Sequence, residues 1–173
     1  MIQKAPSTVT DLIHQARESR AERLELSRLQ LVTVPAEIGT LTELRTLDLG
    51  GNRLRLLPPE IGMLTALEDL YVRENQLSEL PKEICCLTRL VNLWLGNNSL
   101  ARLPDCIGKL AALEELYLND NELALLPPTV CELPSLRELD LSRNSLTGLP
   151  PELAQLHDLM ILRVSGNELR SML

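Results

Sequence analysis

A single pattern of 23 residues recurs along this chain from about Ala21 to the last residue, and it limits the possible fold more than any other feature. The first full copy, LxxLxLxxNxL, starts at Leu44. Further copies start at Leu67, Leu90, Leu113, Leu136 and Leu159. A degenerate copy starts at Ala21 and has Leu29 where the others have asparagine. A repeat of this length predicts a solenoid in which each unit packs only on its neighbours.

Each part of the pattern has a physical role. The Leu-x-Leu alternation favours a short strand with one face in the core and the other in solvent. The asparagine that follows has an amide side chain that can satisfy backbone groups left free at the turn. The second half of each repeat has a proline in register, at Pro58, Pro81, Pro104, Pro127 and Pro150. Because proline fixes φ and cannot donate to a ladder, the return segments should be irregular or 3-10 helical.

We therefore predict an α/β fold, a right-handed solenoid shaped as a horseshoe. Short parallel strands would line its concave face, and irregular or 3-10 segments would line its convex face. Residues 23–173 would hold six to seven repeats, the last of them incomplete. The stacked leucines would form an almost purely aliphatic core, which is consistent with 45% hydrophobic but only 2% aromatic residues.

Residues 1–22 are predicted to form an N-terminal capping helix, because the terminal repeat of a solenoid needs a polar cover. Ser7 or Thr10 would cap its N-terminus, and Asp11 suits its first turn. Its apolar stripe would consist of Leu12, Ile13 and Ala16. The degenerate copy at Glu25–Leu31 would then supply the edge strand.

No comparable cap is visible at the C-terminal end, where the sequence stops partway through a repeat at Ser171-Met172-Leu173. The last coil is expected to be frayed, covered by a partner, or cut from a longer protein. Docking through this edge, around Leu169, Met172 and Leu173, is one hypothesis, and the protein would be a monomer or a weak dimer.

Composition excludes several classes of function. A net charge of −7 argues against nucleic acid and against an anionic membrane surface, both of which need basic patches. The first six residues do not resemble a signal peptide, and no apolar run approaches the length of a membrane span. The cysteines lie in the second halves of repeats, at Cys85, Cys86, Cys106 and Cys131. We expect reduced thiols and a cytoplasmic location, with the nucleus as an alternative.

The long consensus LPxxIxxLxxLxxLxLxxNxL resembles intracellular leucine-rich repeat proteins of the Ras-suppressor and Shoc2-like type, and the plant Ras-group-related proteins. The stretch from Leu12 to Ser27 is similar to the helix-plus-strand entry of that group. The resemblance implies a non-enzymatic scaffold, often in small-GTPase or phosphatase signalling, that binds protein partners on the concave sheet. It covers nearly the whole chain, which carries no appended PDZ, GTPase, kinase or ligase domain.

All three aromatic residues, Tyr71, Trp94 and Tyr117, occupy position 5 of the repeat, counted from its first leucine. Strands about 4.8 Å apart would align them in one strip, and Tyr and Trp dominate interface hot spots. Charged neighbours on the same face are Asp69, Arg73, Glu115, Asp120, Glu138 and Asp140. The carboxylates favour a partner with a basic, partly apolar segment, whose cations would stack on the rings. The alternative is that the rings only pack on each other and shield the sheet.

Other constellations are weaker. A zinc site needs four converging ligands, and His14 and His157 lie near opposite ends of the array, so we expect neither a metal nor a cofactor. A catalytic Cys/His pair is disfavoured for the same reason. The carboxylates lie on a solvated sheet and do not resemble a shielded acid/base pair. The sequence therefore predicts no enzyme activity.

Overall fold

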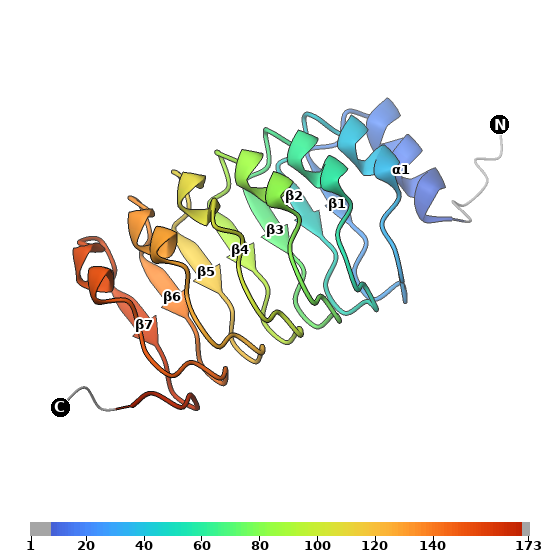
Figure 1. The fold of residues 1–173 in the computed structure, drawn as a ribbon. Helices are drawn as coiled ribbons and strands as arrows, with labels where there is room; N and C mark the ends of the chain where they lie inside the picture. Colours follow the sequence, from blue (N-terminus) through green and yellow to red (C-terminus); the bar gives the residue numbers. More distant parts are fainter. Residues whose placement is uncertain (1–7, 171–173) are drawn as a thin grey trace, which may run out of the picture.

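The computed structural model describes residues 8–170 of the chain. Seven short strands lie side by side in chain order and form one parallel sheet (Figure 1). They are β1 (Arg23–Glu25), β2 (Thr46–Asp48), β3 (Asp69–Tyr71), β4 (Asn92–Trp94), β5 (Glu115–Tyr117), β6 (Glu138–Asp140) and β7 (Ile161–Arg163). Each residue pairs with its equivalent in the next repeat, as Tyr71 does with Trp94. Each column of the repeat therefore becomes a column of the sheet, which confirms the predicted solenoid.

The return segments form short 3-10 turns on the other side of the coil from the strands (Figure 1). They are η1 (Ala36–Thr40), η2 (Pro59–Met63), η3 (Lys82–Cys86), η4 (Ile107–Lys109), η5 (Pro128–Glu132) and η6 (Pro151–Gln155). All except η4 follow directly on the proline in register, as its fixed φ predicted. We call the strand side the concave face and the turn side the convex face.

The core is one continuous aliphatic layer between the strands and the turns. The position-4 leucines are 0% exposed from Leu47 to Leu139, and the isoleucines after the prolines, such as Ile61 and Ile84, are equally buried. Each such side chain contributes about 1.5–3 kcal/mol of transfer free energy. Aliphatic side chains fill almost all of this layer, and the three aromatic residues lie on the concave face, where they are only half-buried.

The helix α1 (Val9–Glu18) covers the N-terminal end of the core with Ile13 and Ala16, as predicted. Its N-cap is Thr8, which forms a reciprocal capping box with Asp11. The prediction of Thr10 as the N-cap is therefore wrong, because Thr10 already lies in the first turn. Ser7, the other predicted cap, lies outside the described residues. The edge strand also starts earlier than predicted, at Arg23.

The recurring asparagines join neighbouring repeats through their side chains, as their amide chemistry predicted. Asn121 is representative: its Nδ2 donates to the carbonyls of Leu95 and Leu118 at 3.0 and 3.1 Å, and its Oδ1 accepts from the N–H of Leu100 at 2.9 Å. The same three contacts recur at Asn52, Asn75, Asn98, Asn144 and Asn167. We call this array the asparagine ladder.

The residue at position 8, which precedes the asparagine in six repeats and Leu29 in the degenerate one, has a left-handed backbone, which the sequence did not predict. The φ angles at position 8 lie between +53° and +72° in Arg28, Gly51, Glu74, Asn97, Asp120, Arg143 and Gly166. This conformation costs a non-glycine residue about 1–2 kcal/mol. It turns the chain off the strand, so that the next side chain, the asparagine, points back beneath the sheet.

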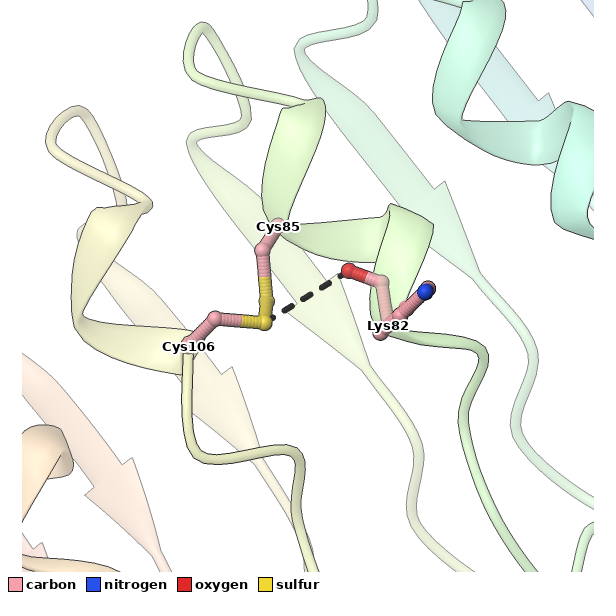
Figure 2. Close-up of a disulfide and its surroundings, with 3 residues drawn as sticks. All are labelled: Lys82, Cys85 and Cys106. Atoms are coloured by element: carbon pink, nitrogen blue, oxygen red, sulfur yellow. Dashed lines mark hydrogen bonds between the residues drawn. A yellow bond between two sulfur atoms is a disulfide. The ribbon is translucent and has the colours of Figure 1, made fainter.

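Cys85 of η3 and Cys106, directly before η4, form a disulfide between neighbouring coils, with Cα atoms 5.9 Å apart (Figure 2). The prediction of reduced thiols is wrong for this pair, because the solenoid stacks position 19 of one repeat against position 17 of the next. Cys86 is an exposed free thiol and Cys131 a buried one. The sulfur of Cys106 also lies 3.5 Å from the carbonyl oxygen of Lys82, a contact and not a hydrogen bond because a disulfide sulfur carries no proton.

The disulfide occupies a crowded column of the convex face. Three repeats have glycine at the position of Cys85, namely Gly39, Gly62 and Gly108. A Cβ added at Gly62 or Gly108 would lie 2.5 Å from a carbonyl oxygen of the next turn. Cys85 carries a side chain at this position, and η4 starts only at Ile107, two positions later in the repeat than η3 starts at Lys82. The bridge therefore coincides with a local change in the packing between repeats.

Candidate functional site

The three aromatic rings form one continuous stripe across β3, β4 and β5. Tyr71 and Trp94 have ring centroids 4.8 Å apart with planes tilted by 60°, and Trp94 meets Tyr117 edge-to-face at 5.3 Å. Such tilted pairs contribute about 0.5–1.5 kcal/mol beyond their buried area. We call these three residues the aromatic stripe. The predicted alignment of the rings is thus present, and each ring contacts the next.

Two rings of the stripe are fixed by carboxylates of the following repeat. The indole Nε1 of Trp94 donates to Glu115 at 3.2 Å, and the hydroxyl of Tyr117 donates to Glu138 at 2.6 Å. Arg163 reaches the same Glu138 carboxylate at 3.5 Å. Each ring therefore leans diagonally toward position 3 of the next repeat. Charge-assisted hydrogen bonds of this kind hold an aromatic side chain in one orientation.

The environment raises the pKa of both tyrosines above the ordinary value. The pKa of Tyr117 rises to about 12, chiefly because its hydroxyl donates to the Glu138 carboxylate and then because of burial. The pKa of Tyr71 rises because of burial and then because of the negative charge of Asp69. Among the described residues, the Tyr71 hydroxyl has no hydrogen-bond partner. Both side chains are therefore neutral donors at physiological pH, and that of Tyr71 is available.

The carboxylates on the position-3 side of the stripe are Asp69, Glu115 and Glu138, and we call them the acidic flank. Asp69 accepts from Thr46 at 3.0 Å and from Asn92 at 2.6 Å, so it too is fixed by neighbouring strands. All three are half-buried. An ionised carboxylate has about four lone-pair sites, so each keeps the capacity to accept from a partner.

The two other predicted carboxylates lie near the far end of the stripe and are engaged locally. Asp140 accepts from the backbone N–H of Ser142 at 2.9 Å and from its hydroxyl at 2.5 Å. Asp120 accepts from Asn119 at 2.8 Å and pairs with Arg143 at 3.4 Å. Asp140 follows Tyr117 in the position-5 column, whereas Asp120 belongs to the turn at position 8. These two residues therefore border the stripe at different edges.

Arg73 lies on the other side of the stripe from the acidic flank. The central carbon of its guanidinium group is 5.8 Å from the centroid of the Trp94 ring, within cation–π range. From the sequence, we predicted that a cation of the partner would stack on this ring. Because a cation of the chain itself already stacks there, a partner's cation has better access to the acidic flank and to the tyrosines.

A pocket of about 310 Å³ opens beside Trp94 on the Arg73 side. It is lined by Arg73, Glu74, Trp94, Gly96, Asn97, Tyr117 and Asn119. Of its lining residues, Glu74, Asn97 and Asn119 were not among the predicted site residues. The repeat pattern could have identified them, since they occupy positions 7 and 8, which follow the aromatic column on the same face.

The described residues include no group of three or more side chains suited to hold a metal ion. No helix between residues 8 and 170 is long and apolar enough to cross a membrane. His157 is exposed on the segment before β7, away from the stripe. The concave face thus presents aromatic surface, fixed carboxylates and the stacked guanidinium of Arg73.

Comparison with known families agrees with the geometry. Residues 23–122 match the model of a leucine-rich repeat region, and residues 111–169 match a second leucine-rich repeat model. A comparison with curated proteins gives no match. The family models thus cover the whole sheet, but they do not distinguish the Ras-suppressor type from other leucine-rich repeat proteins.

Solved structures show the same fold. A leucine-rich repeat protein of Leptospira interrogans is 36% identical with a TM-score of 0.75, over 99% of this chain and 49% of its own. The ectodomain of the Arabidopsis thaliana receptor kinase GASSHO1/SCHENGEN3, in complex with CASPARIAN STRIP INTEGRITY FACTOR 2, is 31% identical with a TM-score of 0.78, over 86% and 18%. The domain of the type III effector XopL is 27% identical with a TM-score of 0.86, over 92% and 57%. This chain spans less than two thirds of each.

Proposed function

The chain belongs to the leucine-rich repeat family, and we propose that it is a non-enzymatic binding module that holds a protein partner on its concave face. The observation that carries this proposal is the aromatic stripe: three half-buried rings, each in contact with the next, on a face that is otherwise mostly polar. Each ring can bury roughly 150–250 Å² against a partner. The stripe therefore supplies the kind of anchor that dominates protein interfaces.

The partner is proposed to present a basic, partly apolar segment. Its apolar side chains would cover the stripe, and its Lys or Arg side chains would pair with the acidic flank. The overall charge of −7 would attract such a segment at long range. Among the matched proteins, the GASSHO1/SCHENGEN3 ectodomain was solved with a bound factor, so the fold is used for binding there.

A role in small-GTPase or phosphatase signalling, and a cytoplasmic location, are part of this proposal and rest on the resemblance of the consensus. They require that Cys85 and Cys106 be reduced in the cell, since disulfides persist in oxidising compartments. The test is thiol alkylation of cells at lysis followed by mass spectrometry. Alkylated Cys85 and Cys106 would support the cytoplasmic location, and an intact bridge would contradict it.

The binding proposal is tested by selecting random peptides, displayed on phage, against the immobilised protein. Tyr71→Ala/Trp94→Ala/Tyr117→Ala should weaken binding of the selected peptides roughly 100-fold, because each lost anchor costs more than about 1 kcal/mol. The control variant, Leu56→Ala/Met63→Ala/Leu125→Ala, removes three apolar side chains that are more than half exposed and lie outside the stripe.

Circular dichroism establishes that both variants remain folded. Selected peptides that bind the stripe variant as tightly as the wild type would show that the rings serve only packing. Peptides that lose affinity for the control variant would place the binding surface elsewhere.

A second candidate is docking through the C-terminal edge, and one observation favours it. Leu162 of β7 is 39% exposed, whereas the equivalent Leu139 and Leu116 are fully buried. Met160 beside it is 80% exposed. Leu169 is also exposed, while Met172 and Leu173 lie outside the described residues. A molar mass that rises with concentration, and returns to the monomer value in Leu162→Glu, would support weak dimerisation here; a constant monomer mass would exclude it.

A further inference from the structure

Two arginines of the outer strands, Arg23 and Arg163, pair with neighbouring carboxylates. Arg23 pairs with Glu25 at 2.9 Å, and Arg163 pairs with Glu138 at 3.5 Å. Arg73, in the middle of the face, differs from them. Among the described residues, no carboxylate lies within ion-pair distance of its guanidinium group, whose recorded side-chain partner is the Trp94 ring.

The repeat explains why Arg73 has no ion-pair partner. Its neighbours in the position-7 column are Gly50 and Gly96, which have no side chains to offer. The next residue in that column, Asn119, directs its amide nitrogen to Asp120 and places its Oδ1 over Gly96, where an added Cβ would meet it at 2.5 Å. The two glycines thus offer no charged group to Arg73, and Gly96 lines the pocket beside Trp94 together with Arg73.

The pocket combines three features that together define its ligand. The guanidinium group presents a planar fork of donors, which matches a carboxylate better than any other common side chain. The rings of Trp94 and Tyr117 give it an apolar wall. Its volume of about 310 Å³ is sufficient for one side chain of the partner. Glu74 also lines the pocket but lies outside ion-pair distance of Arg73. Because Glu74 repels negative charge, a ligand carboxylate is favoured on the Arg73 side of the pocket.

We propose that Arg73 selects an acidic side chain, Asp or Glu, of the partner, with its carboxylate on the guanidinium group and its methylene groups against Trp94. This inference rests on the proposed function and refines it. Arg73 lies four residues after Asp69 of the acidic flank, which corresponds to about 13 Å at the rise per residue of a β-strand. The partner segment would therefore be amphoteric, basic along the edge that faces Asp69, Glu115 and Glu138 and acidic along the opposite edge. This polarity would fix the direction in which the segment lies.

The experiment repeats the peptide selection on the wild type, on Arg73→Glu and on Arg89→Glu. Arg89 is exposed, forms no ion pair with any residue between 8 and 170, and lies outside the concave face. Its variant therefore changes the net charge equally. Wild-type and Arg89→Glu selections should enrich Asp or Glu at one fixed position. Arg73→Glu should enrich Lys or Arg there. Phage-displayed peptides are fused at their C-terminus, so any enriched carboxylate belongs to a side chain.

Synthetic peptides complete the test. The most enriched wild-type peptide is compared with its counterpart in which Asp or Glu becomes Asn or Gln. The acidic form should bind the wild type roughly three- to tenfold more tightly, the range of a partly exposed charged pair, and this preference should vanish in Arg73→Glu. Equal affinity of both forms for the wild type, or no acidic position in the selection, overturns the inference.

The two proposals fail in different ways. If the stripe variant loses the peptides while Arg73→Glu selects the same sequences as the wild type, the stripe binds the partner and the role of Arg73 is wrong. If the selected peptides still bind the stripe variant, or if no peptide binds the wild type better than that variant, the proposed function fails. This inference then fails with it.

Discussion

Replacing Asn121 with alanine tests whether the asparagine ladder holds the repeats together. Asn121 is 8% exposed and connects backbone groups of two repeats. Without its side chain, the N–H of Leu100 loses the one hydrogen-bond acceptor that it has within the described part of the chain. The carbonyls of Leu95 and Leu118 remain hydrogen-bonded, because each keeps a second donor from a neighbouring asparagine of the ladder. The cost is therefore dominated by one orphaned donor.

The magnitude follows from these three contacts. A buried donor left without a partner costs about 1–3 kcal/mol, and each weakened carbonyl adds about 0.5 kcal/mol. We expect Asn121→Ala to lower the free energy of unfolding by about 3 kcal/mol. That is a large part of the roughly 5–15 kcal/mol available to a domain.

Urea unfolding followed by the fluorescence of Trp94, the single tryptophan, measures this change. Trp94 lies in the strand next to the one that precedes Asn121, so it reports on the affected repeats. Asn167→Ala is the matched control: Asn167 makes the same three contacts but is more exposed, and water can replace them at a cost below about 1 kcal/mol. Equal losses for both variants, or a loss below about 1 kcal/mol for Asn121→Ala, would refute the reasoning.

Two further predictions concern the convex bridge and the tyrosines. The Cys85–Cys106 bridge spans 21 residues, so Cys85→Ser/Cys106→Ser should destabilise the protein by about 3 kcal/mol by loop entropy, whereas exposed Cys86→Ser should have no effect on the urea midpoint. An unchanged midpoint in the double variant would contradict the bridge. The pKa of Tyr117 is raised to about 12, so the unfolded chain ionises first and stability should fall as the pH rises from the ordinary tyrosine pKa through the folded one. Tyrosinate absorbance should show that Glu138→Gln returns this pKa toward its ordinary value; no change would exclude the Glu138 hydrogen bond.

The parts of the fold that depend on periodicity could be predicted from the sequence. Leucines at a fixed spacing specify the strands and the core, and the recurring asparagines and prolines specify the turns. The start of the helix was less certain, because Thr8 and Thr10 are both good caps and only Thr8 has Asp11 three residues after it. The left-handed residue at position 8 could not be predicted, since side chains as different as Glu74 and Arg143 adopt it.

The contacts that define the site depend on side-chain directions, which a repeat pattern does not specify. The sequence placed Trp94 and Glu115 in different columns of the sheet. Their hydrogen bond exists because the indole leans across to the next repeat. The disulfide was missed for a related reason: Cys85 and Cys106 occupy different positions of the repeat, and only the stacking of the convex turns brings them together. The predicted site residues therefore lie on one face, but their partners had to be found in the structure.

The structure also bears on the choice between packing and binding as the role of the aromatic stripe. The hydrogen bonds of Trp94 and Tyr117 fix the rings before any partner arrives, and this reduces the entropy lost when a partner binds. Stabilising contacts within the stripe thus do not argue against recognition, because a binding surface gains from the same rigidity. Tyr71 is the residue that separates the two roles. Its hydroxyl has no hydrogen-bond partner among the described residues, so packing accounts for the ring but leaves the polar end unexplained. Tyr71→Phe should therefore leave stability unchanged and weaken only the binding of a partner that accepts from this hydroxyl.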